Sequence, residues 1–262
     1  MTVHHSSMDT KMLLQNYKTL IDSLVVDPEA VNYEIMRHHT GLLERLAVVE
    51  NSSMRIMDLF QKKYIFIRNR FKAHLSWNES EAEERGYSYF FSLMHPDDLP
   101  LVLDTSIKSL KFLIDTEPAE RMKYKSFFEF RLRDPSGQYV RFIQQNMVLE
   151  LDLKGNIWLI LILLDLCPNQ QDSKMFQRSM VNMRDNKVCL FNEDSHTGNI
   201  QLSKRETEIL GLLSKGMISK EIADKLFISV NTVNNHRQKI IEKMDVANTS
   251  EALSYAEKIG II

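Results

Sequence analysis

This 262-residue sequence has little cysteine, no large excess of one charge and no long hydrophobic run. Only Cys167 and Cys189 are present, and they form no CxxC pair, which is typical of a reducing compartment and indicates neither a zinc site nor a redox motif. The 33 basic and 35 acidic residues leave a net charge of −2. The overall charge therefore does not indicate a polyanionic partner, although a local basic surface is compatible with it.

Targeting and catalytic motifs are also missing. The longest apolar run, Ile157 to Leu164, is far shorter than the roughly 18 residues that a membrane-spanning helix needs. The stretch from Met1 to Thr10 is polar and lacks the apolar core of a signal peptide, so we expect a cytoplasmic protein without a membrane partner. No Gly-rich phosphate loop, nucleophile elbow or metal-ligand cluster is present, so we expect neither an enzyme nor a cofactor or metal site.

The composition that remains is that of a soluble globular protein, with 44% apolar and 26% charged residues. The length permits one large domain or two ordinary ones. Composition and patterning divide the chain into four segments. We expect an N-terminal helical segment over residues 1–50, a mixed α/β domain over 51–166, a polar linker over 167–200 and a helical domain over 201–262.

The N-terminal segment shows two apolar stripes at helical spacing. The first consists of Leu13, Tyr17, Leu20, Ile21 and Leu24. After a break at Asp27, Pro28 suits the first turn of a second helix, whose stripe consists of Ile35, Leu42, Leu46 and Val49. Two such helices cannot bury both stripes alone, so we expect them to pack on the neighbouring domain or on a second copy of the chain.

The second segment carries strand patterns at both ends. Apolar runs around 54–59 and 64–67 predict two strands, and a helix is expected over Leu99 to Ile114. Three further strands are expected around 128–132, 140–151 and 157–164, separated by turn residues at 134–137 and 152–156. This order indicates an antiparallel α+β sheet with helices on one side. In the linker, only Lys187 to Phe191 has the pattern of a strand.

The last segment predicts four short helices. Ser203 and Glu206 form a capping-box pattern, and Ser219 and Ser229 are expected to cap the next two helices. The residues expected to form the core are Ile209, Leu210, Leu213, Ile222, Leu226, Val233, Ile240 and Met244. A two-residue connection between the second and third helices is typical of a helix-turn-helix.

The third of these helices has an unusual outward face. Asn231, Asn234, Asn235 and Gln238 differ by three or four positions, so they form one patch. Asn is a weak helix former, which makes a patch of amides a poor choice for a merely solvated surface. Carboxamides suit the edges of adenine bases in the major groove. The alternative is a helical docking module that binds no nucleic acid.

The segment of residues 202–262 resembles the LuxR-type (GerE-type) helix-turn-helix domain of bacterial transcription regulators. The matching residues are Leu202-Ser203-Lys204-Arg205-Glu206-Thr207-Glu208-Ile209-Leu210, Lys220-Glu221-Ile222-Ala223, Ser229, Thr232-Val233, His236, Lys243-Met244, Val246 and Glu251-Ala252. In that family the helix near Ser229 enters the major groove, so double-stranded DNA is the implied partner. Lys220 and Thr232 would contact phosphates, and Asn234, Asn235 and Gln238 would face bases.

The full set of candidate DNA-binding residues follows from this resemblance together with the patch. It consists of Lys220, Ser229, Asn231, Thr232, Asn234, Asn235, Arg237, Gln238, Lys239 and Lys243. Two positions depart from the family, which usually has Lys at Asn234 and Arg at Thr249. His236 lies on the inward stripe, so we expect it to pack or to border a phosphate. With nine basic and eight acidic residues in 201–262, one copy should bind DNA weakly, which favours a homodimer.

The second segment resembles a PAS domain through Phe91-Ser92-Leu93-Met94-His95-Pro96-Asp97-Asp98-Leu99 and the later strand pairs. The resemblance implies a five-stranded antiparallel sheet flanked by helices, with a sensing or dimerising role and a small-molecule or protein signal. We interpret His95 to Asp98 as ordinary capping at a helix start. The sequence thus favours a transcription regulator; a PAS-type adaptor whose helix-turn-helix docks on a protein is the alternative.

Overall fold

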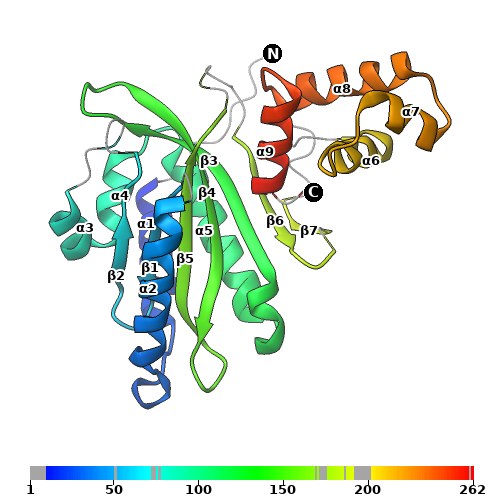
Figure 1. Cartoon of the computed structure of the whole chain (residues 1–262). Helices are drawn as coiled ribbons and strands as arrows, with labels where there is room; N and C mark the ends of the chain where they lie inside the picture. Colours follow the sequence, from blue (N-terminus) through cyan, green and yellow to red (C-terminus); the bar gives the residue numbers. More distant parts are fainter. Residues whose placement is uncertain are drawn as a thin grey trace. The chain divides into compact units, whose positions relative to one another are not determined.

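The structure is a computed structural model, and it describes residues 10–49, 52–71, 75, 78–168, 170, 176–185, 187–191, 202–259, 261 and 262. The chain divides into two compact units, Met1–Leu166 and Cys167–Ile262, which are described separately (Figure 1). The expectations for the polar N-terminus, for Gly260 as the end of the last helix and for much of the linker lie outside the described residues.

The first unit is built on a five-stranded antiparallel sheet. Its strands are β1 (Ser53–Asp58), β2 (Lys63–Arg68), β3 (Tyr124–Arg133), β4 (Tyr139–Leu151) and β5 (Ile157–Leu166), in the order β2-β1-β5-β4-β3. Asp134 and Asp152 close the β3–β4 and β4–β5 turns, because each carboxylate accepts hydrogen bonds from backbone amides two and four residues later. The PAS-like α+β fold expected from the sequence is confirmed, but the expected total of five strands is not, because the described chain has seven strands, five of them in this unit.

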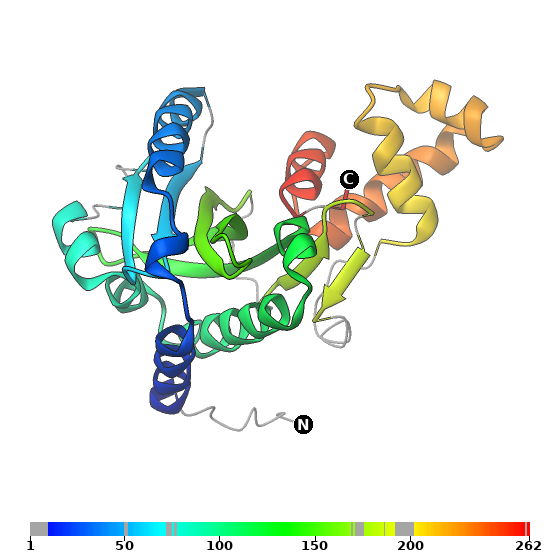
Figure 2. The same cartoon turned by 90° about the horizontal axis from the view of Figure 1, so that it is seen from below.

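Helices cover both faces of this sheet (Figures 1 and 2). The helices of the unit are α1 (Thr10–Ser23), α2 (Tyr33–Val49), α3 (Glu79–Arg85), α4 (Tyr87–Leu93) and α5 (Leu99–Asp115). Met36 and Leu43 of α2 pack on Met54 and Ile56 of β1, whereas α1, α4 and α5 lie on the opposite face. All six residues of β1 are consequently buried. The expectation of helices on one side only is wrong.

The second N-terminal helix differs from its prediction in start and in orientation. Pro28 begins a separate 3-10 turn, Pro28–Ala30, which Asp27 caps through the Glu29 amide, and α2 starts only at Tyr33. The stripe expected to pack is turned outward, with Ile35, Leu42 and Leu46 39%, 49% and 40% exposed. The side chain of Val49 lies outside the described residues. A rotation of one residue explains this difference, since Met36 and Leu43 immediately follow Ile35 and Leu42.

The stretch from His95 to Asp98 joins helix to sheet rather than only capping a helix. Asp98 occupies the N-cap position of α5, yet its side chain makes no capping bond. Its carboxylate instead accepts hydrogen bonds from the backbone amide, Nε and Nη2 of Arg131 on β3, at 2.8, 2.9 and 2.7 Å. The His95 amide returns a bond to the Arg131 carbonyl at 2.9 Å. The capping interpretation of Asp98 is therefore wrong, and its role is to fix α5 against β3.

The second unit contains two strands and four helices within its described residues. β6 (Arg178–Asn182) pairs antiparallel with β7 (Lys187–Leu190), both inside the segment expected to be a linker. The strand pattern at 187–191 is confirmed, whereas β6 was not expected. The helices α6 (Lys204–Leu213), α7 (Ser219–Leu226), α8 (Val230–Met244) and α9 (Thr249–Ile259) match the four expected. In the described part of the chain, no helix combines the length and apolarity needed to cross a membrane.

Candidate nucleic-acid interface

Caps at the helix starts position α6, α7 and α8. The Ser203 hydroxyl accepts from the Glu206 amide at 3.2 Å while Glu206 accepts from the Ser203 amide at 2.6 Å, so the capping box is confirmed. Ser229 caps α8 by accepting from the Thr232 amide at 3.0 Å. Ser219 does not cap α7, because Ile218 holds the N-cap position and Glu221 accepts from its amide at 2.9 Å.

A small apolar core holds these helices together. Ile209, Leu210, Ile222 and Val233 are fully buried, as are Ile240 and Met244 at the far end of α8. Leu213 and Leu226, expected in the core, are only half-buried, and Leu212 is buried instead. The final turn of α6 is therefore rotated by one residue from the expected face.

The turn between α7 and α8 sets the direction of α8. Phe227 has left-handed backbone angles, with φ at +54°, and its side chain is 95% exposed. The next amide, of Ile228, donates to the Ala223 carbonyl at 3.0 Å, which closes the end of α7. This tight reversal allows only two residues before Ser229 starts α8.

The side-chain amides on the outward face of α8 differ in whether they already make hydrogen bonds within the unit. Asn231, Asn235 and Gln238 lie opposite Val233 and Ile240 and are exposed. Gln238 Nε2 donates to Glu242 Oε1 at 3.1 Å, so one end of that amide is engaged. Among the described residues, Asn231 and Asn235 make no side-chain hydrogen bond, which leaves both ends of each amide available. Lys220 on α7 and Lys239 on α8 are exposed as well.

Asn234 and Arg237 belong to a polar network inside the unit. The Ser219 hydroxyl donates to Asn234 Oδ1 at 2.9 Å and accepts from Arg237 Nη1 at 2.7 Å. Arg237 Nη2 also reaches Thr249 Oγ1 at 3.1 Å. The network joins α8 to the starts of α7 and α9, so Thr249 still offers a contact where the family usually has Arg. Within the described residues, the Asn234 amide nitrogen has no partner, whereas its oxygen already accepts from Ser219.

Lys243 is likewise engaged, by a carboxylate that sequence spacing did not reveal. Its ammonium lies 2.6 Å from Glu206 Oε2, and Glu206 is only 3% exposed. Burial alone would raise the pKa of the Glu206 carboxyl, but Lys243 and the Ser203 cap outweigh it and hold the pKa below its usual value. The two residues are 37 positions apart in the sequence, so only the fold of the unit brings the exposed Lys243 to the buried Glu206.

His236 and the remaining candidates occupy the edges of the outward face. His236 is half-buried, and its Nδ1 is buried with no hydrogen-bond partner among the described residues. Thr232 is half-buried, and its hydroxyl lies 2.8 Å from that of Ser229. Two hydroxyls therefore stand together at the N-terminus of α8.

Comparison with known proteins identifies the class of this unit. Residues 200–256 match the family model of GerE, the bacterial regulatory proteins of the luxR family. The C-terminal segment is a LuxR-type helix-turn-helix domain.

Individual relatives match over the same short stretch. The oxygen regulatory protein NreC of Staphylococcus carnosus is 51% identical over 57 residues, which are 22% of this chain and 26% of NreC. NreC of Staphylococcus aureus shows the same identity and coverage. The chain thus spans about a quarter of the length of the curated relatives it matches.

Solved structures are similar to a larger part of the chain at low scores. A phage VqmA–DPO complex is 14% identical, covering 84% of this chain and 90% of that chain, with a TM-score of 0.30. A Vibrio cholerae VqmA dimer is 12% identical, covering 84% and 88%, with a TM-score of 0.31. The N-terminal domain of a Marinobacter aquaeolei diguanylate cyclase with a PAS/PAC sensor is 15% identical, covering 44% and 94%, at 0.36. At these scores, nothing about ligands or partners follows.

Proposed function

We propose that the protein is a sequence-specific DNA-binding transcription regulator and not an enzyme. In this proposal α8 enters the major groove, and the PAS-like unit receives a signal or mediates dimerisation in the cytoplasm. The observation that carries the proposal is the outward row of amides on α8 within a helix-turn-helix that matches the luxR family. The same match favours DNA over the docking of an adaptor on a protein.

The hydrogen bonds divide the ten candidate residues by role. Asn235 and Asn231 keep an amide donor and an acceptor, as bidentate contact with adenine requires. Asn234 offers only its donor and suits an acceptor on guanine or phosphate, and Gln238 keeps chiefly its oxygen. The cations Lys220 and Lys239, with Ser229 and Thr232, would contact phosphates. Arg237 and Lys243 would position α8 rather than touch DNA.

The weak charge of the helical unit supports a homodimer. Its near-neutral balance limits the phosphate contribution that one copy can supply, so two copies would be needed for useful affinity. The outward stripe of Ile35, Leu42 and Leu46 on α2 is a suitable surface for a second copy. Two-fold symmetric binding would place the half-sites about 10 base pairs apart.

Selection from random duplexes tests the DNA assignment. We expect Asn235→Ala to cost about 1–3 kcal/mol on the best site and to flatten the preference at one base pair, because an amide pairs with adenine. Lys220→Ala should weaken all sequences alike and lower the salt slope by about one, because its contact is to phosphate. Repeating the selection with each variant at two salt concentrations separates the two effects.

Exposed residues outside the interface provide matched controls. Asn16→Ala on α1 and Lys215→Ala after α6 remove the same groups from exposed positions and should leave binding unchanged. If Asn235→Ala weakens every duplex equally, Asn235 touches only phosphates and the assignment of the base reader is wrong. If the unmodified protein binds no duplex in the selection, the proposed function is wrong.

A further inference from the structure

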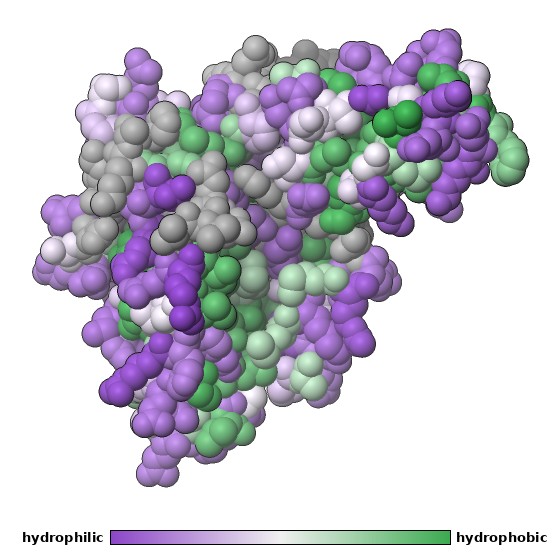
Figure 3. Space-filling view, viewed as in Figure 1, coloured by the Kyte–Doolittle hydropathy of each residue, from purple (hydrophilic) through white to green (hydrophobic). Residues whose placement is uncertain are grey.

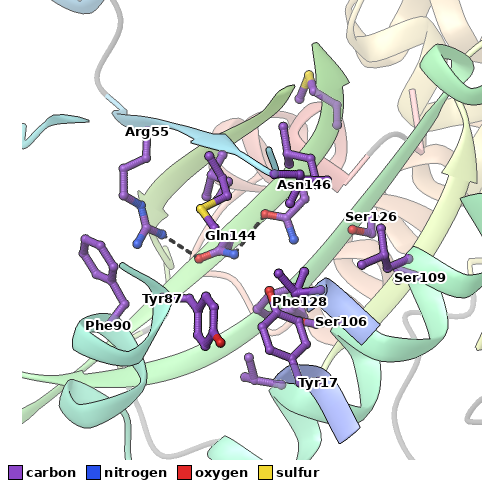
Figure 4. Close-up of a pocket in the computed structure, with 18 of the residues that line it drawn as sticks. Tyr17, Arg55, Tyr87, Phe90, Ser106, Ser109, Ser126, Phe128, Gln144 and Asn146 are labelled. Atoms are coloured by element: carbon purple, nitrogen blue, oxygen red, sulfur yellow. Dashed lines mark hydrogen bonds between the residues drawn. The ribbon is translucent and has the colours of Figure 1, made fainter. Parts of the chain in front are cut away.

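The first unit contains a cavity on the sheet face opposite α2. It lies between the sheet and helices α1, α4 and α5, and its volume is about 90 Å³ (Figure 4). On this measure a cavity needs roughly 10–15 Å³ to hold one water, so this cavity has room for several waters or about one ring. Aromatic side chains of Tyr87, Phe90 and Phe128 line it together with aliphatic ones.

Three polar side chains form a directed chain of hydrogen bonds along the sheet side of this cavity. Arg55 on β1 is 3% exposed, and its Nη2 donates to Gln144 Oε1 on β4 at 2.8 Å. Gln144 Nε2 in turn donates to Asn146 Oδ1 at 2.9 Å (Figure 4). The Arg55 guanidinium also lies 3.9 Å from the centre of the Phe90 ring, which fixes it in place.

The chemistry of arginine sets the direction of this chain. A guanidinium has donors and no acceptor, so the Gln144 oxygen must face it and the Gln144 nitrogen must face Asn146. The Asn146 oxygen then accepts from Gln144, and its amide nitrogen, which has no partner among the described residues, ends the chain. The Asn146 amide therefore offers N–H donors to the cavity, and the described residues of the lining include no Asp or Glu that would accept them.

A second polar group, on the helix side of the cavity, also lacks a hydrogen-bond partner among the described residues. Ser109 on α5 is 5% exposed, and its hydroxyl is buried with no hydrogen-bond partner among the described residues. Ser109 lines the cavity. Buried hydroxyls are normally paired, and leaving one unpaired is unfavourable. A molecule in the cavity that offers this hydroxyl a partner would remove that penalty.

We propose that this cavity binds a small planar ring compound whose carbonyl or carboxylate oxygen accepts a hydrogen bond from Asn146. The ring packs among the aromatic side chains, and Ser109 supplies a second polar contact from α5. This inference names the class of signal for the PAS-like unit and rests on the proposed sensing role. It commits to an acceptor group on the ligand, because the directed chain ends in a donor.

Three probes of nine non-hydrogen atoms each separate the chemistry from the shape. Acetophenone carries a carbonyl oxygen, α-methylstyrene has a CH₂ group in its place, and benzoate is a planar anion. We expect the full-length protein to bind acetophenone at least fivefold more tightly than α-methylstyrene, measured by ligand-detected NMR, since one neutral hydrogen bond accounts for about that factor. If benzoate binds more tightly than acetophenone, the natural ligand is anionic, and if benzoate binds more weakly, the natural ligand is neutral. Either result supports a ligand that carries a hydrogen-bond acceptor.

Two variants connect the preference to the cavity wall. Asn146→Leu keeps the volume but removes the donor, so it should abolish the preference for acetophenone. Met147→Leu, the matched control, changes an apolar lining residue and should retain the preference. A thermal melt of each variant shows whether it is folded. If Asn146→Leu does not fold, Ser109→Ala provides an independent test, because the loss of the Ser109 hydroxyl should reduce acetophenone binding.

Equal binding of acetophenone and α-methylstyrene, or a preference that survives Asn146→Leu, would overturn the inference. Failure of all three probes to bind at 5 mM would overturn it as well. Gel shifts of the ligand-free protein are measured in parallel. Retained DNA binding without probe binding rejects the cavity inference alone, whereas probe binding without DNA binding rejects the proposed function alone.

Discussion

At the scale of single residues, side chains that look alike in sequence have different tasks. Asn234 and Asn235 are neighbours on the same amide patch, yet Asn234 is tied to Ser219 whereas Asn235 is not engaged within the described chain. Lys220 is exposed and forms no ion pair within the described chain, whereas Lys243 forms an ion pair with the buried Glu206. These differences arise from hydrogen-bond and ion-pair partners on other helices. The residue pattern along one helix does not reveal such partners.

The Lys243–Glu206 pair leads to a stability prediction. Lys243→Met should lower the free energy of unfolding of the helical unit by about 1–2 kcal/mol, because it leaves a buried carboxylate without its cation; Lys243 is itself 40% exposed, so the cost is below that of a fully buried pair. Denaturant melts at pH 7 measure this change. Lys215→Met, at an exposed position after α6, is the control and should change little.

The same pair predicts a dependence on pH. The pKa of Glu206 is lowered from its ordinary 4.5 in the folded unit, so its contribution is present above that value and is lost as the pH falls through the lowered pKa. The difference between the protein and Lys243→Met should therefore shrink as the pH of the melts falls below 4.5. A difference that stayed constant down to pH 2 would show that the ion pair is not its cause.

At the scale of elements, helix existence was predictable and helix rotation was not. Periodicity located α1, α5 and α8 closely, because each carries one dominant apolar stripe. In α2 two stripes compete: Ile35 and Leu42 on one, Met36 and Leu43 on the other. The sheet face decides between them, since Met54 and Ile56 accept the second stripe. A single sequence does not contain that contact.

The outward stripe of α2 leads to a prediction about assembly. Leu42→Asp with Leu46→Asp should shift the full-length protein from dimer to monomer in sedimentation, because charged groups at an apolar interface are desolvated unfavourably. Val25→Asp is the control, since Val25 is 76% exposed and lies off the stripe. A protein that is already monomeric at high concentration would contradict the dimer itself.

The turn between α7 and α8 permits a test of backbone strain. Left-handed angles disfavour residues with a Cβ by roughly 1–2 kcal/mol and disfavour β-branched residues most. Phe227→Gly should therefore leave the melting temperature equal or raise it, while Phe227→Val should lower it, since the exposed ring loses little packing. If Phe227→Gly were the less stable of the two variants, the ring rather than the backbone would decide the stability of this turn.

At the scale of the whole molecule, the helical unit has the features of a module that folds alone. It has its own core around Leu210, Ile222 and Val233 and its own caps at Ser203 and Ser229. A fragment from Asn199 to Ile262 should show cooperative helical melting in circular dichroism. A broad, non-cooperative signal would place the boundary of the folding unit elsewhere, because it would show that residues before 199 are needed.

The burial of Trp158 beneath α2 has a practical consequence for optical work on this protein. Both tryptophans of the sequence, Trp77 and Trp158, precede Leu166, and Trp158 is 1% exposed in contact with Tyr33. Indole emission therefore reports on the PAS-like unit and is silent on α6 to α9, while far-ultraviolet ellipticity registers both. Recording the two signals on one sample separates the melting of the units without cutting the chain. In a Trp77→Phe variant, whose indole emission comes from Trp158 alone, a red shift without loss of ellipticity would mark the release of α2 from its sheet.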